Sequence, residues 1–276
     1  MNEVQGWFPP RDISLQLGAD SGRSPFDPTH TEKLRRSFCA AAIVRLNQTR
    51  AAMRKAVIDH DVLGLRGSMM AYHTEEVRLT AFNKWFEMTT IMYFDGGWLD
   101  RYIEQGWDSG SNAASEEVGV NAPYHLPRAL IQLGRQEISG ILAALTQQVS
   151  RSASYMIETK PVPPRAFRCM VQPFDSIRKR LIDFTEWMTV KAHNDAKLAV
   201  YEINGIDELR LIPEMVHVVT DARNLAGIRT AGDDRVCDRC NHMAQRSPYT
   251  LARAKGLIPL HPRCRCSWYL WTSRVS

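Results

Sequence analysis

A long apolar repeat in the second half of the chain constrains the fold most. Its members recur every three or four residues, which is the spacing of one face of an α-helix, and they are Ile177, Leu181, Phe184, Met188, Ala192, Ala196, Ala199 and Ile203. We expect this helix to begin near Phe174 and to end at Asn204 and Gly205, a pair typical of helix ends. It would extend on the order of 40 Å at about 1.5 Å per residue. Such a stripe is what a helix packed in a hydrophobic core requires, and it implies no cofactor.

Further helical segments precede this repeat. Apolar residues at helical spacing predict long helices over about residues 31–58, 74–94 and 127–156. A short amphipathic piece is expected over residues 98–105. Residues 106–115 are rich in Gly, Ser and Asn, so we expect a loop there.

The segments outside these helices divide the chain into three predicted regions. Residues 1–30 lack apolar periodicity and predict an irregular arm, and residues 160–173 contain four prolines and predict a linker or an extended crossing. The valine-rich residues 215–220 predict a strand. The expected organisation is therefore an N-terminal arm, a helical body over residues 31–214 and a small module over residues 215–276. The predicted fold class is mainly α, with an elongated helical body and a small C-terminal α+β zinc-binding module.

The composition fits a folded globular protein, with 44% hydrophobic and 24% charged residues. No apolar run approaches the length of about 18 residues that a membrane span needs, and the arm lacks the basic head and apolar stretch of a signal peptide. We therefore expect neither secretion nor a membrane partner. Phosphate-loop, nucleophile-elbow and dinucleotide-binding motifs are missing, so no small-molecule substrate is expected.

Four of the six cysteines lie near the C-terminus as C-x-x-C and C-x-C pairs. They are Cys237, Cys240, Cys264 and Cys266, and His261 precedes the second pair. In a chain without an export signal, this pattern favours a metal over disulfides. Zinc takes four ligands in a tetrahedron, and two short pairs joined by a loop supply them with little strain. We expect Cys237, Cys240 and Cys264 to be ligands, with His261 and Cys266 as alternatives for the fourth position.

The predicted zinc site is structural rather than catalytic. A catalytic zinc keeps one open position and a carboxylate base nearby, and Asp233, Asp234 and Asp238 are the available acids. This cluster can instead close its own coordination shell. The arginines that flank the cysteines suit a surface contact better than hydrolysis, and the H-x-E triplet that deaminases pair with C-x-x-C is absent.

The same residues carry a family resemblance. The string DDRVCDRC, followed by PYTLARAKGLIPLHPRCRCSW, closely resembles the C-terminal signature of the phage Mu F-like minor head proteins, also called head morphogenesis proteins. In that family an acidic pair leads into R-V-C-x-x-C, a Tyr-Thr-Leu turn follows, and H-P-x-C-R-C closes the motif. The match is specific because it combines several fixed residue types with the right gaps.

The resemblance extends upstream over most of the chain from about Asp27. The segment DFTEWMTVKAHNDAKLAVYEINGI is similar to the helix that precedes the signature in members of the family. Two earlier segments, DPTHTEKLRRSF and WLDRYIEQGWDSG, resemble the opening and middle segments of those members. Two positions depart from the pattern. Phe184 stands where an arginine usually precedes Thr-Glu, which argues against an electrostatic site on this helix. The glycine common after C-x-x-C is absent from residues 243–247, which suggests a reshaped loop.

The polar residues of that helix have a simpler interpretation than catalysis. Glu186, His193 and Asn194 do not share a single helical face. We expect them to cap or to form hydrogen bonds between helices.

The resemblance implies a virion structural protein without enzymatic activity. Members of the family act in head assembly beside the portal or the capsid shell, often at low copy and in contact with DNA. The implied partners are the portal protein, the major capsid protein, or both, and packaged double-stranded DNA. The implied location is the phage head, and the host cytoplasm during assembly.

The first predicted helix has a lopsided charge that folding alone does not explain. This helix contains one acidic residue, Glu32, and seven basic residues, whereas the whole chain has a net charge of only +5. The seven are Lys33, Arg35, Arg36, Arg45, Arg50, Arg54 and Lys55. We expect Arg35, Arg36, Arg45, Arg50, Arg54 and Lys55 to contact DNA phosphates or an acidic partner surface. A solvated helix face is the alternative. Contact with duplex phosphate would be salt-sensitive and independent of sequence.

A different class of function stays open at this point. The zinc module could support a DNA-processing site, as in treble-clef nucleases. Such a site needs a histidine and metal-binding acids near the knuckle, for which His242 and Asp233 are the plausible candidates.

Overall fold

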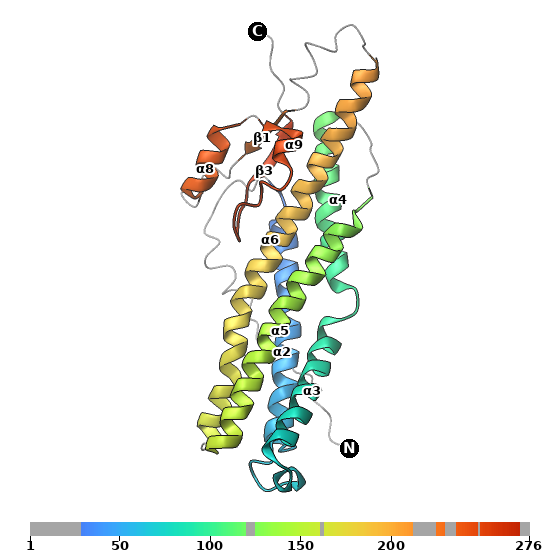
Figure 1. The fold of residues 1–276 in the computed structure, drawn as a ribbon. Helices are drawn as coiled ribbons and strands as arrows, with labels where there is room; N and C mark the ends of the chain where they lie inside the picture. The colour runs from blue at the N-terminus through green and yellow to red at the C-terminus, as the bar shows by residue number, and fades with distance from the viewer. Residues whose placement is uncertain are drawn as a thin grey trace.

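The computed structural model describes residues 29–119, 125–160, 163–211, 225–229, 236–247 and 249–270. Long helices dominate these residues, and they are α2 (Glu32–Ile58), α3 (Glu75–Phe94), α4 (Trp98–Val118), α5 (Arg128–Thr159) and α6 (Pro163–Leu211). Figure 1 shows the helices side by side, with the short C-terminal elements next to the upper part of α6. The prediction of a mainly helical fold with a few short strands near the C-terminus is confirmed.

The apolar repeat of α6 forms the spine of the bundle core. Ile177, Leu181 and Met188 are fully buried, and so are Ala192 and Ala196. The stripe leaves the core at its end, where Ile203 is 39% exposed. Because this face contacts α2, α4 and α5, the helix organises the rest of the bundle.

Aromatic rings join α2, α4 and α6 in the core. The ring of Phe38 stacks on Tyr102 at 4.7 Å between centroids, and it meets Trp98 and Phe184 edge to face at 5.6 and 6.2 Å. Such pairs contribute about 0.5–1.5 kcal/mol each beyond the area that they bury. The side chain of Phe184 therefore serves core packing.

The loop between α2 and α3 is built around one carboxylate. Asp61 is only 6% exposed and accepts hydrogen bonds from the backbone N–H groups of Leu65, Arg66 and Ser68 at 2.7, 2.9 and 3.1 Å. A short 3-10 helix, η1 (Met69–Tyr72), follows. The hydroxyl of Thr74 then accepts from the N–H of Val77 and caps α3.

The expected loop over residues 106–115 is wrong, because α4 is one helix to Val118. Its glycines pack against α6 instead of breaking the helix. A Cβ atom on Gly106 would stand 3.1 Å from the Cβ of Ala192, and one on Gly110 would collide with the backbone of His193. Close packing between the two helices therefore outweighs the weak helix propensity of glycine, which costs about 1 kcal/mol per residue.

Both expected ends of α6 also need correction. The helix begins at Pro163, so most of the predicted linker over residues 160–173 is helical, and Pro173 lies inside it. Burial of Phe174 and Ile177 in the core opposes the cost of an interior proline, which is about 3 kcal/mol. At the other end, the side chain of Asn204 donates to the carbonyl of Val200 rather than ending the helix, which continues to Leu211.

The C-terminal residues form a small α+β module. Its elements are β1 (Leu225–Arg229), α8 (Asp238–Gln245), β2 (Tyr249–Thr250), α9 (Leu251–Ala254) and β3 (Ser267–Leu270). The strands pair antiparallel in the order β2-β1-β3. The strand predicted over residues 215–220 and residues 1–28 of the arm predicted over residues 1–30 lie outside the described residues.

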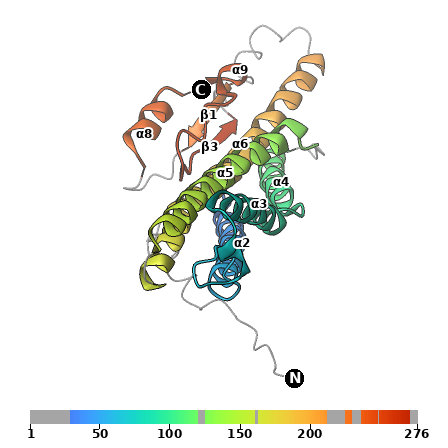
Figure 2. The same cartoon turned by 60° about the horizontal axis from the view of Figure 1, so that its bottom comes forward.

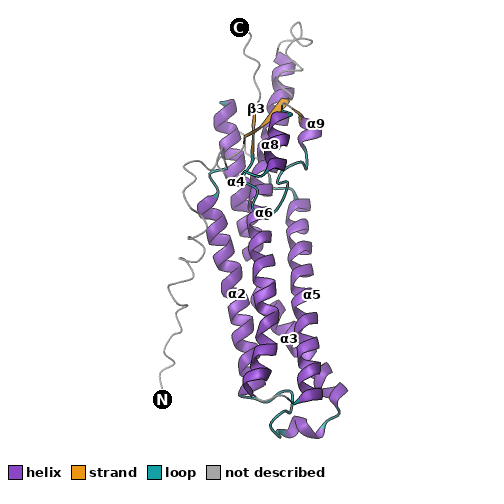
Figure 3. Ribbon diagram, turned by 90° about the vertical axis from the view of Figure 1, so that its left-hand side faces the viewer, coloured by secondary structure: helices purple, strands orange, loops and turns teal. Residues whose placement is uncertain are grey.

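The module shares its core with the helical body. A second hydrophobic cluster joins Leu251, Ile258 and Trp268 of the module to Ala114 of α4 and Tyr201 of α6. The two turned views place the module against the upper part of α6 (Figures 2 and 3), and β3 also contacts α4. The module that carries the C-terminal cysteines thus packs against the long helices α4 and α6.

Candidate metal centre

The first cysteine pair lies where α8 begins. Cys237 is the N-cap residue of this helix, and its Sγ accepts a hydrogen bond from the backbone N–H of Cys240 at 3.4 Å. An N–H directed at sulfur stabilises a thiolate, as does the N-terminus of a helix. The pKa of Cys237 is correspondingly low: its slight burial alone would raise it, but hydrogen bonds with Cys240 and the charge of His261 lower it.

The second group of donors lies on the turn that leads into β3. The N–H of Cys264 donates to the carbonyl of His261 at 3.1 Å, and Arg263 adopts a left-handed conformation with φ of 65°. This tight turn directs His261, Cys264 and Cys266 toward α8. Cys264 and Cys266 are buried, whereas Cys237 is exposed.

The structure brings all five predicted donors together in two groups that share Cys240. Cys237, Cys240 and His261 form one group, and Cys240, Cys264 and Cys266 form the other, with the donor atoms of each group within 4.8 Å of one another. The Nε2 atom of His261 lies 3.2 Å from the sulfurs of Cys237 and Cys240, and the sulfurs of Cys240 and Cys264 are 4.0 Å apart. Ligand atoms around a tetrahedral zinc lie about 3.5–3.8 Å apart. The donors therefore fit a metal ion, and all four cysteines are free thiols.

The buried sulfurs share their protons unequally. Hydrogen bonds with Cys240 and Cys266 lower the pKa of Cys264, which favours its thiolate. The hydrogen bond with Cys264 raises the pKa of Cys240. For Cys266 the hydrogen bond with Cys240 lowers the pKa, but the contact with Cys264 and burial outweigh it and raise the pKa. A cation in the cluster would replace the shared protons, because a metal ligand must be a thiolate.

The imidazole of His261 is oriented for coordination. Its Nδ1 atom lies 2.6 Å from the carbonyl oxygen of Pro262 and must donate to it, because a carbonyl is only an acceptor. In the neutral ring this leaves the Nε2 lone pair directed at Cys237 and Cys240. Metal-binding histidines commonly have their second nitrogen fixed in this way.

The other cysteines and the candidate residues for a nuclease site belong to neither of the two donor groups. Cys39 is buried in the bundle, where burial raises its pKa to about 11. Cys169 lies on α6 and is half-buried. His242 is on α8 but belongs to neither group, and Asp233 is outside the described residues.

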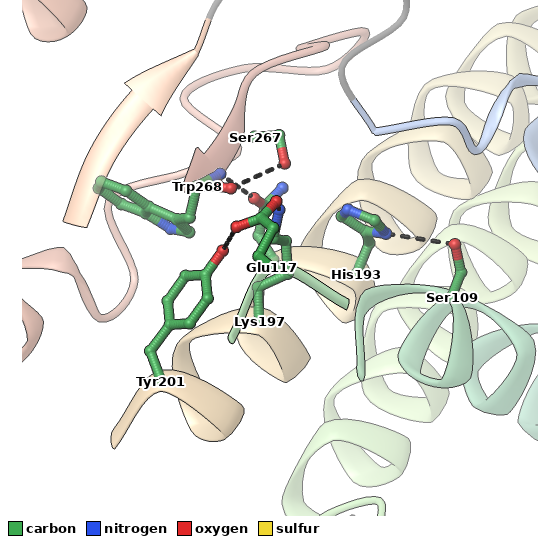
Figure 4. Close-up of polar contacts among 8 residues, drawn as sticks. Ser109, Glu117, His193, Lys197, Tyr201, Ser267 and Trp268 are labelled. Carbon is green, nitrogen blue, oxygen red and sulfur yellow. Dashed lines mark hydrogen bonds and ion pairs between the residues drawn. The ribbon is translucent and has the colours of Figure 1, made fainter. Parts of the chain in front are cut away.

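Polar residues of α6 connect the centre to the bundle. The amide of Asn194 contacts the backbone of Cys266 and Trp268, and Ser109 of α4 lies 3.3 Å from Nδ1 of His193 (Figure 4). Hydrogen bonding between elements, as expected for His193 and Asn194, is thus confirmed. Arg263 of the ligand turn pairs with Asp183 at 3.2 Å and lies 3.8 Å from Glu186.

The sequence does not predict a charged cluster next to these contacts, in which Lys197 and Tyr201 are buried and Glu117 reaches the surface. Lys197 is 3% exposed and pairs with Glu117, which also accepts a hydrogen bond from the hydroxyl of Tyr201 (Figure 4). The partners belong to α4 and α6 and are about 80 positions apart in sequence. Periodicity does not reveal the pair, because a loop is expected over residues 106–115 and no predicted helix contains Glu117.

The six basic residues singled out on α2 do not form one exposed face. Arg35 is only 9% exposed, and its charge helps to lower the pKa of Glu186, although burial raises that pKa overall. The guanidinium of Arg45 lies 4.5 Å from the ring centroid of Trp98 and donates to the carbonyl of Ala41. These two side chains are directed into the bundle, which corrects the expectation that they belong to a contact surface.

The other four basic residues are closer to solvent. Arg36 pairs with Glu32, and Arg50 lies 3.8 Å from Asp175. Arg54 and Lys55 are exposed on the last turns of α2.

Comparison with known proteins adds no relative. No family model matches the chain, and neither a curated protein nor a solved structure matches it significantly. Among the described helices, none is both long and apolar enough to cross a membrane. The resemblance to phage head proteins therefore stays a prediction from the sequence motifs.

Proposed function

We propose that this chain is a virion structural protein, a minor capsid or head morphogenesis component of a tailed phage. It acts in head assembly near the portal or the capsid interior. The elongated helical body supplies surfaces for the portal or major capsid protein, and the exposed basic residues of α2 and the C-terminal arginines contact packaged DNA. The motif from Cys237 to Cys266 carries this proposal, because its sequence resembles the family signature and its five donors form two groups that share Cys240.

The metal proposed for this centre is zinc in a structural role. A set of thiolates and one imidazole suits zinc better than the oxygen-preferring cations. Because the protein offers more donors than a tetrahedron needs, the coordination shell can close without water. Zinc would then hold α8 and the turn before β3 together, which stabilises a module too small to fold on a large core.

The surroundings of the centre favour a contact role over hydrolysis. The pocket over the centre is lined by Cys237, Cys240, His261 and Cys266, together with Val236, Arg263 and Arg265. Its charged members among the described residues are arginines, which bind phosphate or carboxylate groups well. A hydrolytic zinc site would instead need a carboxylate base at this position.

These arginines also keep a second function under test. A DNA-processing enzyme could use them to hold a phosphate beside the metal. Incubation of the purified chain with plasmid DNA and either magnesium or zinc separates the two functions. We expect intact plasmid; nicking that disappears in the His242→Ala variant would favour the enzyme.

Mass spectrometry of purified phage particles is the direct test of the proposed function. We expect the chain in mature heads at a fixed ratio to the portal protein, with empty proheads as the comparison. Absence of the chain from both particles would overturn the proposal.

A further inference from the structure

One side chain of the long helix α6 holds the peptide of a candidate metal ligand. The Nδ2 atom of Asn194 donates to the carbonyl oxygen of Cys266 at 3.0 Å, and its Oδ1 accepts from the backbone N–H of Trp268 at 2.8 Å. The amide thus pairs with the chain on both sides of Ser267, as a neighbouring strand would. Cys266 is the last donor of the centre and leads directly into β3.

The orientation of this amide is determined by its partners. Asn194 is fully buried, and its second N–H donates to the carbonyl of Val190 at 2.9 Å. Two carbonyls and one N–H surround it, so a flipped amide would set donor against donor and acceptor against acceptor. Asn194 can therefore hold Cys266 in only one position.

The backbone that carries Asn194 is itself held in place. The close approach of Gly110 fixes α4 against the peptide of His193, the preceding residue. Three turns earlier on α6, Asp183 pairs with Arg263 of the ligand turn. Two residues of α6, Asn194 and Asp183, thus contact the turn that carries the donors after α9. Cys237 and Cys240, by contrast, are positioned by the start of α8.

We propose that Asn194 is a positioning residue of the metal centre, which sets the place of the Cys266 sulfur relative to Cys240 and Cys264. This inference rests on the proposed metal site. Residues that orient metal ligands without touching the metal typically change affinity about 10–100-fold when they are replaced. The helical body and the metal would then stabilise each other, because whatever aligns the ligand turn favours both.

The test compares Asn194→Ala with Asn204→Ala in the full chain. Asn204 lies on the same helix and donates to the carbonyl of Val200 at 2.9 Å, as Asn194 donates to Val190. It is the matched control, because no described contact joins its side chain to the ligand turn. Zinc affinity is measured by competition with a chromophoric chelator, and Co²⁺ is used as a spectroscopic probe of the ligand set.

We expect Asn194→Ala to weaken zinc binding at least about 10-fold and to alter the thiolate-to-Co²⁺ absorption band, while Asn204→Ala leaves both unchanged. The variant Asn194→Asp has the same size and keeps the acceptor for Trp268, but it loses the donors to Cys266 and Val190. It should also bind zinc more weakly. Circular dichroism of the metal-free proteins reports whether the helices are intact.

The outcomes separate the inference from the proposed site. If the wild-type chain binds neither zinc nor Co²⁺, the metal site itself is overturned. If the wild type binds and both Asn194 variants bind equally well with the same spectrum, the positioning role is overturned. Loss of the helical signal in both variants would also overturn it, because Asn194 would then be a folding residue.

Discussion

The carbonyl oxygen of His193 lies 2.0 Å from the point where a Cβ atom would stand on Gly110. No side chain larger than hydrogen fits there, and the atom in the way belongs to the backbone of α6. The contact lies beside the hydrogen bond between Ser109 and His193. It therefore sets the distance between α4 and α6 at the level of the metal centre.

Replacing Gly110 with alanine should destabilise the protein strongly. Overpacking of a rigid contact costs about 1–3 kcal/mol and sometimes more, and here neither backbone can move without disturbing the core. Gly140→Ala on α5 is the control, since a Cβ at Gly140 meets nothing within 4 Å. It should stabilise by about 0.4–1 kcal/mol. Urea unfolding followed by circular dichroism measures both, and equal stabilities would contradict the close packing.

The comparison of sequence and structure shows where periodicity is informative. Helices α2, α3 and α5 agree with the predicted segments, because their apolar residues recur without interruption. The end of α4 was missed because Gly106 and Gly110 have a low intrinsic helix propensity. Their value for packing depends on Ala192 and His193, whose proximity no local pattern reveals.

Charge patterns were less informative than metal-ligand spacing. The five donors from Cys237 to Cys266 lie in two groups that share Cys240, since short C-x-x-C and C-x-C turns need little help from the rest of the fold. The basic residues of α2 do not share one exposed face, because a long arginine side chain can place its aliphatic part and its guanidinium in a core. Arg45 over Trp98 is such a case, and sequence counts alone cannot separate it from Lys55.

Cysteine replacement tests the metal centre directly. Cys240 belongs to both donor groups, so Cys240→Ser should abolish tight zinc binding and loosen the C-terminal module. Cys169→Ser lies on α6 away from the centre and should retain about one zinc ion per chain. Elemental analysis of the reduced proteins, with limited proteolysis as a measure of module folding, gives the answer. A folded module without metal in the wild type would refute the centre.

Acid should remove the contribution of Asp61 to stability. Burial tends to raise the pKa of this carboxyl, but hydrogen bonds from the N–H groups of Arg66, Ser68 and Leu65 outweigh it and lower the pKa. Because the folded pKa is below the unfolded value of about 3.9, the stabilisation is complete above pH 4 and is lost as the pH falls through the folded pKa.

The variant Asp61→Asn isolates this effect. It should cost about 1–3 kcal/mol at pH 7, since its amide cannot accept all three bonds. The difference in unfolding free energy between the variant and the wild type should shrink below about pH 4. A difference that is constant from pH 7 to pH 3 would mean that the charge of Asp61 does not stabilise the loop.

Charge reversal on α2 tests the proposed contact with DNA or an acidic partner. Arg36, Arg54 and Lys55 are the exposed candidates, and their joint change to glutamate should weaken binding of duplex DNA or the portal protein, most clearly at low salt. The folding free energy should change little, since exposed ion pairs contribute about 0–1 kcal/mol each.

The matched control reverses three exposed arginines on α4 and α5: Arg101, Arg128 and Arg151. It produces the same change in net charge, so a general charge effect would weaken both proteins alike. Binding is measured at two or three salt concentrations for wild type, variant and control. Equal binding by all three would assign α2 a solvated face and leave the C-terminal arginines as the contact.

The second core cluster imposes an order on events during synthesis. Ala114, Leu198 and Tyr201 emerge from the ribosome well before Trp268, the residue that covers this cluster from β3. At a translation rate of about 5–20 residues per second, the apolar surface of α4 and α6 in this cluster stays exposed for a few seconds or more. Nascent chains stalled shortly after α6 should therefore be captured by holdase chaperones, from which finished chains escape.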